Sequence, residues 1–135
     1  MRGSAAVIAG IFLALGYSAA SAETSLERGA YLVNGIAGCG NCHTPRGGPM
    51  KGKELVGGFQ FGGAKAPFTA YSSNITPDRE TGIGGWTDAQ IIVAIREGKR
   101  PDGSVIGAPM PIELYNRMAD NDVKVCTYSP GCARK

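Results

Sequence analysis

The most distinctive chemistry in the sequence lies in five consecutive residues, Cys39-Gly40-Asn41-Cys42-His43. They match the C-x-x-C-H pattern, in which each cysteine can form a thioether with one vinyl group of a haem and the histidine can ligate the iron. His43 is also the only histidine in the chain. The motif therefore predicts one covalently attached haem c, held by Cys39 and Cys42 and ligated by His43.

Three other uses of these cysteines compete with haem attachment. Cys39 and Cys42 could form a redox dithiol, although that role favours a strand–helix setting in a βαβ fold, which the sequence does not show. They could also form a disulfide. Together with Cys126 and Cys132 they could hold zinc, but the C-x5-C spacing of the second pair is loose, and zinc would leave the histidine without a role.

A second axial ligand would have to be another residue type, because the chain has no second histidine. Four methionines are candidates, of which Met1 leaves with the leader described below. Met50 lies only seven residues after His43, and Met118 has core packing as its simpler role. Met110 stands between two prolines, whose fixed φ stiffens the loop. We therefore predict Met110 as the ligand, with Met118 and an open site as the alternatives.

Ligation by histidine and methionine would fix the kind of chemistry that the haem performs. Such a pair raises the haem potential and keeps the iron six-coordinate. A closed coordination sphere disfavours substrate binding at the iron and suits outer-sphere transfer of single electrons. An enzyme acting on peroxide or a small gas would need a polar distal group, and the only histidine is already used. A structural zinc module is a third functional alternative.

The first 22 residues have the layout of a secretory signal peptide. Arg2 precedes an apolar run from Ala5 to Tyr17, and Ala20-Ser21-Ala22 is a small-residue cleavage site. The apolar run is shorter than the roughly 20 residues of a membrane-spanning helix. We expect cleavage and export to the periplasm, the kind of compartment in which haem is attached to such motifs; an uncleaved anchor is the alternative.

Residues 23–135 are then the mature chain, which is long enough for one domain and too short for two. Without Arg2 the chain has 13 basic and 11 acidic residues, a net charge of +2, and these charges are scattered. Nothing in them suggests a nucleic-acid-binding patch. The 21 glycines and 8 prolines follow no Gly-X-Y period and predict many loops.

Three short helices are predicted by their capping patterns. Capping boxes at Thr24-x-x-Glu27 and Thr87-x-x-Gln90 begin the first two, and Asp120 is expected to be the N-cap of the third. The expected ends are Asn34-Gly35, Gly98 and, for the third helix, before Pro130-Gly131. No alternating strand is evident, and long loops are expected at 38–63, 74–85 and 99–111. The predicted fold is all-α, with short helices and Gly/Pro-rich loops around one haem.

Five segments of the chain occur in an order that resembles a known family. They are Arg28-Gly29-Ala30-Tyr31-Leu32, Cys39-Gly40-Asn41-Cys42-His43-Thr44-Pro45, Asn74-Ile75-Thr76-Pro77-Asp78, Thr81-Gly82-Ile83-Gly84-Gly85-Trp86 and Met110-Pro111-x-x-x-Tyr115. The set resembles the class I cytochrome c domains of bacterial periplasmic dehydrogenase complexes, such as the cytochrome subunits of alcohol and aldehyde dehydrogenases and of molybdenum hydroxylases. The similarity extends over roughly residues 24–125.

The resemblance implies a small cytochrome c fold with a partly exposed haem edge, and it supports Met110 as the distal ligand. It also places the loop from Asn74 to Trp86 against the haem, where Asn74, Tyr71 and Trp86 could meet the propionates. The plainer roles are a turn for Asn74 and packing at the start of a helix for Trp86. Tyr115 is expected to pack beside the Met110 loop.

The resemblance further implies an electron-transfer protein and not an enzyme. A dehydrogenase subunit would be the electron donor, and a downstream cytochrome or oxidase of the respiratory chain the acceptor. Many members carry three such domains and a membrane anchor. With one motif and no C-terminal anchor in the sequence, we expect a soluble single-haem form or a small subunit, compatible with peripheral membrane association.

The last helix departs from the family pattern. Members end in a longer helix that crosses the first one, whereas here the pattern is lost after Lys124. A helix from Asp120 to Tyr128 would be only about 13 Å long, so we expect it to fray before reaching the first helix and to leave the domain less stable than its relatives. The end is either frameshifted or truncated, or a Cys126–Cys132 disulfide fastens it.

Overall fold

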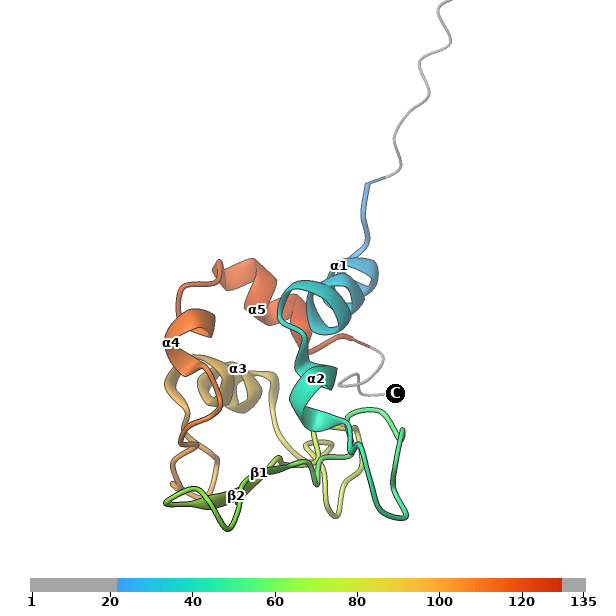
Figure 1. Ribbon diagram of the computed structural model, residues 1–135. Helices are drawn as coiled ribbons and strands as arrows, with labels where there is room; N and C mark the ends of the chain where they lie inside the picture. Colours follow the sequence, from blue (N-terminus) through green and yellow to red (C-terminus); the bar gives the residue numbers. More distant parts are fainter. Residues whose placement is uncertain (1–21, 130–135) are drawn as a thin grey trace, which may run out of the picture.

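The computed structural model describes residues 22–129 and shows a predominantly helical domain with one small β-hairpin (Figure 1). Its helices and strands run in chain order as α1 Ser25–Tyr31, the π-helical turn η1 Leu32–Ile36, α2 Cys39–His43, β1 Gln60–Gly62, β2 Thr69–Tyr71, α3 Asp88–Glu97, α4 Ile112–Tyr115 and α5 Asp120–Cys126. The predicted fold class is confirmed. The predicted signal peptide, apart from its last residue, and Cys132 lie outside the described residues.

The two predicted capping boxes are present. The Thr24 hydroxyl accepts from the backbone N–H of Glu27 at 3.2 Å, and the Glu27 carboxylate accepts from the backbone N–H of Thr24 at 2.9 Å. Thr87 and Gln90 form the same reciprocal pair at the start of α3. Gly98 ends α3 in the left-handed conformation, with φ of 65°. These signals act within a single turn, so the local sequence is sufficient to predict them.

The predicted end of the first helix is wrong. Asn34-Gly35 does not stop it, because α1 passes directly into η1, and the Ala37 N–H donates to the Leu32 carbonyl at 2.8 Å. The wider turn keeps Leu32 and Val33 in the core, where their side chains are 3% and 1% exposed. Asn34 and Gly35 face solvent. Tertiary burial of the two apolar residues outweighs the local stop signal.

The predicted loop at 38–63 contains two elements that the sequence did not suggest. The haem motif forms the one-turn helix α2, and β1 pairs antiparallel with β2 in the register Gln60–Tyr71, Phe61–Ala70 and Gly62–Thr69. Each strand has three residues, of which only the central one is partly buried. Strands this short present no alternating pattern long enough to be recognised.

The last helix begins at Asp120, but Asp120 is not its N-cap. Ala119 occupies that position without a side-chain capping bond, and the Asp120 carboxylate instead accepts from Nη2 of Arg96 at 2.7 Å. A partner from another helix thus takes the carboxylate that the sequence assigned to a local cap. The helix ends at Cys126, before Pro130, as expected.

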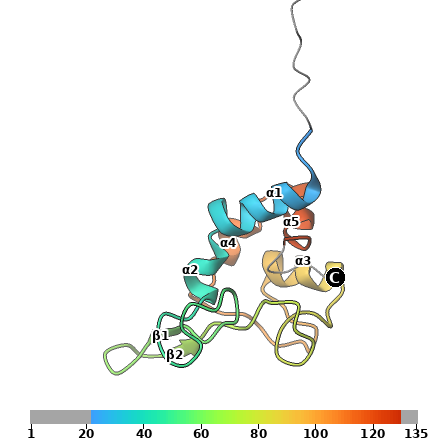
Figure 2. The same ribbon diagram turned by 90° about the vertical axis from the view of Figure 1, so that its right-hand side faces the viewer.

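The expectation that this helix frays before it reaches the first one is wrong. In both views α5 lies against α1 (Figures 1 and 2). Nε and Nη2 of Arg28 donate to the two carboxylate oxygens of Asp122, each at 3.0 Å. Val123 and Val125 are buried, and Gly29 allows the helices to meet, because a Cβ there would overlap the Val125 carbonyl oxygen. The close approach of α5 to α1 lets α5 pack against the first helix although α5 is only seven residues long.

None of the helices within residues 22–129 combines the length and the apolar character needed to cross a membrane.

Candidate haem site

A left-handed glycine directly precedes the haem motif. Gly38 has φ of 57° and precedes α2, and a Cβ at this position would lie 2.7 Å from Nδ2 of Asn41. Only glycine adopts this conformation without strain. The single turn that follows brings Cys39, Cys42 and His43 to the wall of one cavity.

A backbone carbonyl orients the imidazole of His43. Its Nδ1 lies 2.7 Å from the carbonyl oxygen of Ser73, so in the neutral ring Nδ1 carries the hydrogen and donates it to Ser73. Nε2 then keeps its lone pair, which is the form that binds a metal. Burial lowers the pKa of His43, while the Ser73 bond acts in the opposite direction. The side chain thus has the tautomer and the neutral form that a metal ligand needs, and no motif in the sequence predicts the Ser73 contact.

The cavity has a volume of about 600 Å³ and a mostly apolar lining. This size is within the range of cofactor-binding sites. Ile91 and Ile95 of α3 line it, and Phe61 and Tyr71 line it from the β-hairpin. Figure 1 shows α2 separated from α3 and α4, and the cavity receives side chains from all three helices. The size of the cavity and its apolar wall fit a haem c. The thiol, imidazole and thioether groups that line it fit a haem c as well.

Met110 lies on the same cavity as the haem motif. Its side chain is partly buried. Met110 is followed by Pro111, which is the N-cap residue of α4. Met118 also lines the cavity, and it packs in addition against the buried cluster that contains Leu32 and Val33. Met50 is 41% exposed and does not line the cavity. The arrangement therefore leaves two methionines within the site, and Met110 is the one not engaged with that core cluster.

Asn74, Tyr71 and Trp86 all line the cavity. The Asn74 Oδ1 accepts from the N–H and the hydroxyl of Thr76, at 2.9 and 2.7 Å, and its Nδ2 donates to the Thr81 hydroxyl at 2.8 Å. Its side chain thereby holds the loop from 74 to 81. Trp86 packs against the buried cluster beside α3 as well as lining the cavity, and Tyr71 is 65% exposed.

Arg100 also lines the cavity, although no motif in the sequence predicts it. Among the described residues that line the cavity, it is the only lysine, arginine, aspartate or glutamate. Its Nη1 donates to the Ser104 hydroxyl at 3.2 Å and to the Val105 carbonyl at 3.1 Å, within a tight turn closed by the Lys99–Val105 bridge. No motif marks this arginine, because only the folding of the turn brings it to the cavity.

Two further groups belong to the same wall, one buried and one partly buried. Cys126 lines the cavity from α5, and burial raises the pKa of its thiol to about 11. Tyr115 donates its hydroxyl to the Ala37 carbonyl at 2.8 Å, and burial raises its pKa to about 12. Within residues 22–129, no three histidine, cysteine, aspartate or glutamate side chains are grouped as a metal site. Cys132, which the zinc alternative requires, lies outside that range.

The helical fold, the one-turn haem motif and the haem-sized cavity define a small cytochrome c domain. The homologues of the chain are cytochrome c subunits of bacterial dehydrogenases, which confirms the resemblance seen in the sequence.

Three relatives illustrate the match. The chain is 39% identical over 106 residues to the fructose dehydrogenase cytochrome subunit of Gluconobacter japonicus, covering 78% of this chain and 21% of that protein. It is 35% identical over 117 residues to the cytochrome c subunit of the alcohol dehydrogenase (quinone) of Gluconobacter oxydans, with coverages of 83% and 23%. It is 31% identical over 111 residues to the gluconate 2-dehydrogenase cytochrome c subunit of Pantoea cypripedii, with coverages of 78% and 25%. The chain thus spans a fifth to a quarter of these proteins. No family model matches it.

Proposed function

We propose that this chain binds one haem c and carries single electrons from a dehydrogenase to a downstream acceptor. The observation that carries the proposal is the single cavity that Cys39, Cys42, His43 and Met110 share. Homology to cytochrome c subunits of dehydrogenases supports electron transfer as the activity and a dehydrogenase as the partner. A downstream cytochrome or oxidase of the respiratory chain is the proposed acceptor, since a carrier must release each electron that it accepts.

Four residues would hold the haem. Cys39 and Cys42 would form the two thioethers, His43 would bind the iron through Nε2, and Met110 would bind it through its thioether. The bound haem supplies a one-electron iron couple. The chain's own contribution is to fix this set: the Ser73 carbonyl holds the imidazole in its metal-binding tautomer. The apolar wall would limit the access of water to the iron, which would favour a raised potential.

The polar groups of the cavity would meet the haem propionates. Arg100 is the only cation of the Lys/Arg type among the described lining residues, so it is the proposed counter-charge for a propionate. Tyr71 and Trp86 would donate from the hydroxyl and the indole N–H. Asn74 would act mainly through the loop that its side chain holds.

The proposed site of action is the periplasm. A signal peptide over residues 1–22 would direct export, leaving residues 23–135 as the working domain with one haem. Mass spectrometry of the exported protein tests this point, and we expect Glu23 at its N-terminus. An intact Met1 would contradict cleavage and favour the anchored alternative.

The test of the haem site uses protein made together with a c-type cytochrome maturation system. We expect a pyridine haemochrome spectrum with one covalent haem per chain and a weak near-infrared band from thioether-to-iron ligation. Cys39→Ser with Cys42→Ser should abolish covalent attachment. Met110→Ala should abolish the near-infrared band, whereas Met118→Ala and Met50→Ala should retain it. Absence of covalent haem in the wild type would refute the function, and survival of the band in Met110→Ala would reassign the ligand.

A further inference from the structure

The segment that carries Met110 is held mainly at its two ends: the Ile106 N–H donates to the Gly98 carbonyl at 2.6 Å, and α4 follows Pro111. Gly107, Ala108 and Pro109 are exposed. The segment continues into α4, which has four residues. A single helical turn is not stable by itself, because nucleation costs more than one turn of hydrogen bonds returns. The position of Met110 therefore depends on the contacts that hold α4.

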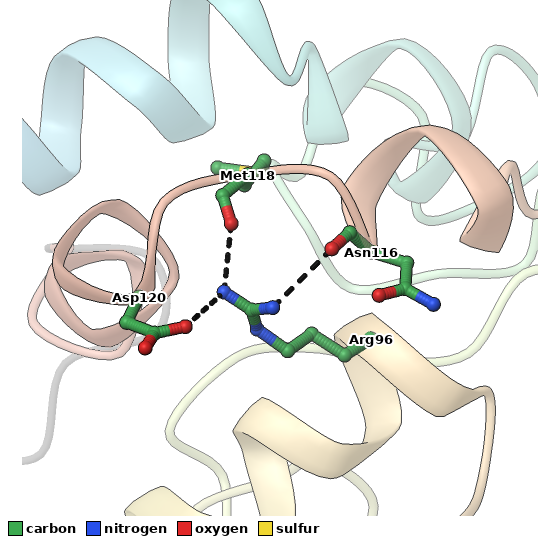
Figure 3. Close-up of polar contacts among 4 residues, drawn as sticks. All are labelled: Arg96, Asn116, Met118 and Asp120. Carbon is green, nitrogen blue, oxygen red and sulfur yellow. Dashed lines mark hydrogen bonds and ion pairs between the residues drawn. The ribbon is translucent and has the colours of Figure 1, made fainter.

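One of these contacts is a guanidinium from α3, shown in Figure 3. Nη1 of Arg96 donates to the Asn116 carbonyl at 3.2 Å, and its Nη2 donates to the Met118 carbonyl at 2.7 Å and to the Asp120 carboxylate at 2.7 Å. Asn116 directly follows α4, and Asp120 begins α5. The Arg96 side chain thus attaches the segment between α4 and α5 to α3. Helix α3 in turn forms one wall of the cavity.

A second contact holds α4 from the side of the haem motif. The Tyr115 hydroxyl donates to the carbonyl of Ala37, the residue before Gly38 and α2. Tyr115 and Asn116 are adjacent, so the end of α4 is tied both to the segment that carries His43 and to α3. Arg96 and Tyr115 act on the same short element, and through it on the loop that precedes it.

We propose that Arg96 is a positioning residue for the distal ligand: by fixing the Asn116 and Met118 carbonyls it holds α4, and thereby keeps the Met110 thioether at the iron against competing ligands. The inference rests on the proposed ligation by His43 and Met110. It adds a residue whose side chain is not among those that line the cavity.

The two carbonyl bonds carry this role more than the ion pair does. Carbonyls at the end of a helix lack partners within it, so a charged donor satisfies groups that would otherwise need water. The side chain of Arg96 is 21% exposed, whereas that of Asp120 is fully exposed, and exposed ion pairs contribute little. Removing the carboxylate should therefore matter less than removing the guanidinium.

Imidazole binding to the oxidised haem-loaded protein measures how readily the methionine leaves the iron. We expect Arg96→Met to bind imidazole roughly tenfold more tightly than the wild type, and its near-infrared band to disappear at lower imidazole concentration. Arg96→Lys, which keeps the charge but fewer donors, should fall between the two. Asp120→Asn should change the affinity less than about twofold. The matched control is Arg117→Met, which removes an exposed arginine from the same connection and should not change the affinity.

Unchanged imidazole affinity in both Arg96 variants would overturn the inference, even if their melting temperatures fell, because the residue would then support only the fold. A gain in Arg117→Met equal to that in Arg96→Met would overturn it too, since charge alone would be the cause. Failure of the underlying ligand proposal gives a different result: Met110→Ala would leave imidazole affinity at the wild-type value.

Discussion

The contact between α1 and α5 makes a sharp prediction for Gly29→Ala. Gly29 is buried in α1, and a Cβ added there would overlap the carbonyl oxygen of Val125 in α5. Gly35 offers a matched control, since it lies in the continuing turn η1, is exposed, and would place a Cβ 3.9 Å from the Tyr31 ring. The two substitutions add the same methyl group, one at the helix crossing and one at the surface.

Two opposing effects set the magnitude. Alanine is more favourable than glycine in a helix by up to about 1 kcal/mol. Overpacking a well-packed site costs about 1–3 kcal/mol, and the upper part of that range applies here, because the group in the way is backbone and cannot rotate aside. The propensity gain is common to both variants. Their difference in the free energy of unfolding should therefore be about 2–3 kcal/mol, or on the order of 10 °C in Tm.

Thermal and urea unfolding of the haem-loaded proteins, followed by far-ultraviolet circular dichroism, would measure this difference. We expect Gly35→Ala to match or exceed the wild type in stability and Gly29→Ala to fall clearly below both. The Soret spectrum should be the same in all three, which checks that the haem site is intact. Equal stability of the two alanine variants would refute the close helix crossing and, with it, the account of how a short α5 closes the fold.

Three further predictions concern single contacts. Tyr115→Phe removes the donor to the Ala37 carbonyl and should lower stability by about 1 kcal/mol, measured by urea unfolding. Asp122→Asn should lower the Tm at neutral pH, because it removes the charged partner of Arg28. The Arg28 hydrogen bond lowers the pKa of Asp122 from its ordinary value of 3.8, so the ion pair stabilises the fold above about pH 3.8 and is lost as the pH falls through the lowered pKa. The Tm difference between the variant and the wild type should therefore vanish in acid. Thr87→Ala removes the N-cap of α3 and should cost about 1 kcal/mol in the same unfolding assay, whereas Thr87→Ser should be close to neutral.

The elements that the sequence predicts well are those set by neighbouring residues. The capping boxes of α1 and α3 and the left-handed Gly98 depend on groups within one turn, and all three are present. The errors arise where a distant partner intervenes. Burial of Val33 extends the first helix past Asn34-Gly35, and Arg96 takes the Asp120 carboxylate away from the predicted cap. Local rules contain no information about either partner.

The same distinction holds for the site. Cys39, Cys42 and His43 are recognisable in the sequence because the C-x-x-C-H pattern has a fixed spacing. Arg100 and the Ser73 carbonyl meet the cavity only after the turn at 99–105 and the strand β2 have formed. Their residue types are common and their spacing from the motif has no chemical meaning. A prediction from sequence therefore identifies the C-x-x-C-H motif and misses the cavity groups that only the fold brings to it.

The shortness of α5 and the position of the proposed distal ligand are connected through one segment. A seven-residue helix cannot stabilise itself, so α5 depends on the close approach at Gly29, on the Arg28–Asp122 pair and on the segment that leads into it. Arg96 holds that segment through the Asn116 and Met118 carbonyls, which lie between α4 and α5. Weakening the contacts that hold the segment between α4 and α5 would therefore also make the Met110 loop, which precedes α4, more mobile. In this domain, weakening the segment between α4 and α5 should lower both the stability of α5 and the strength with which Met110 holds its place as the proposed ligand.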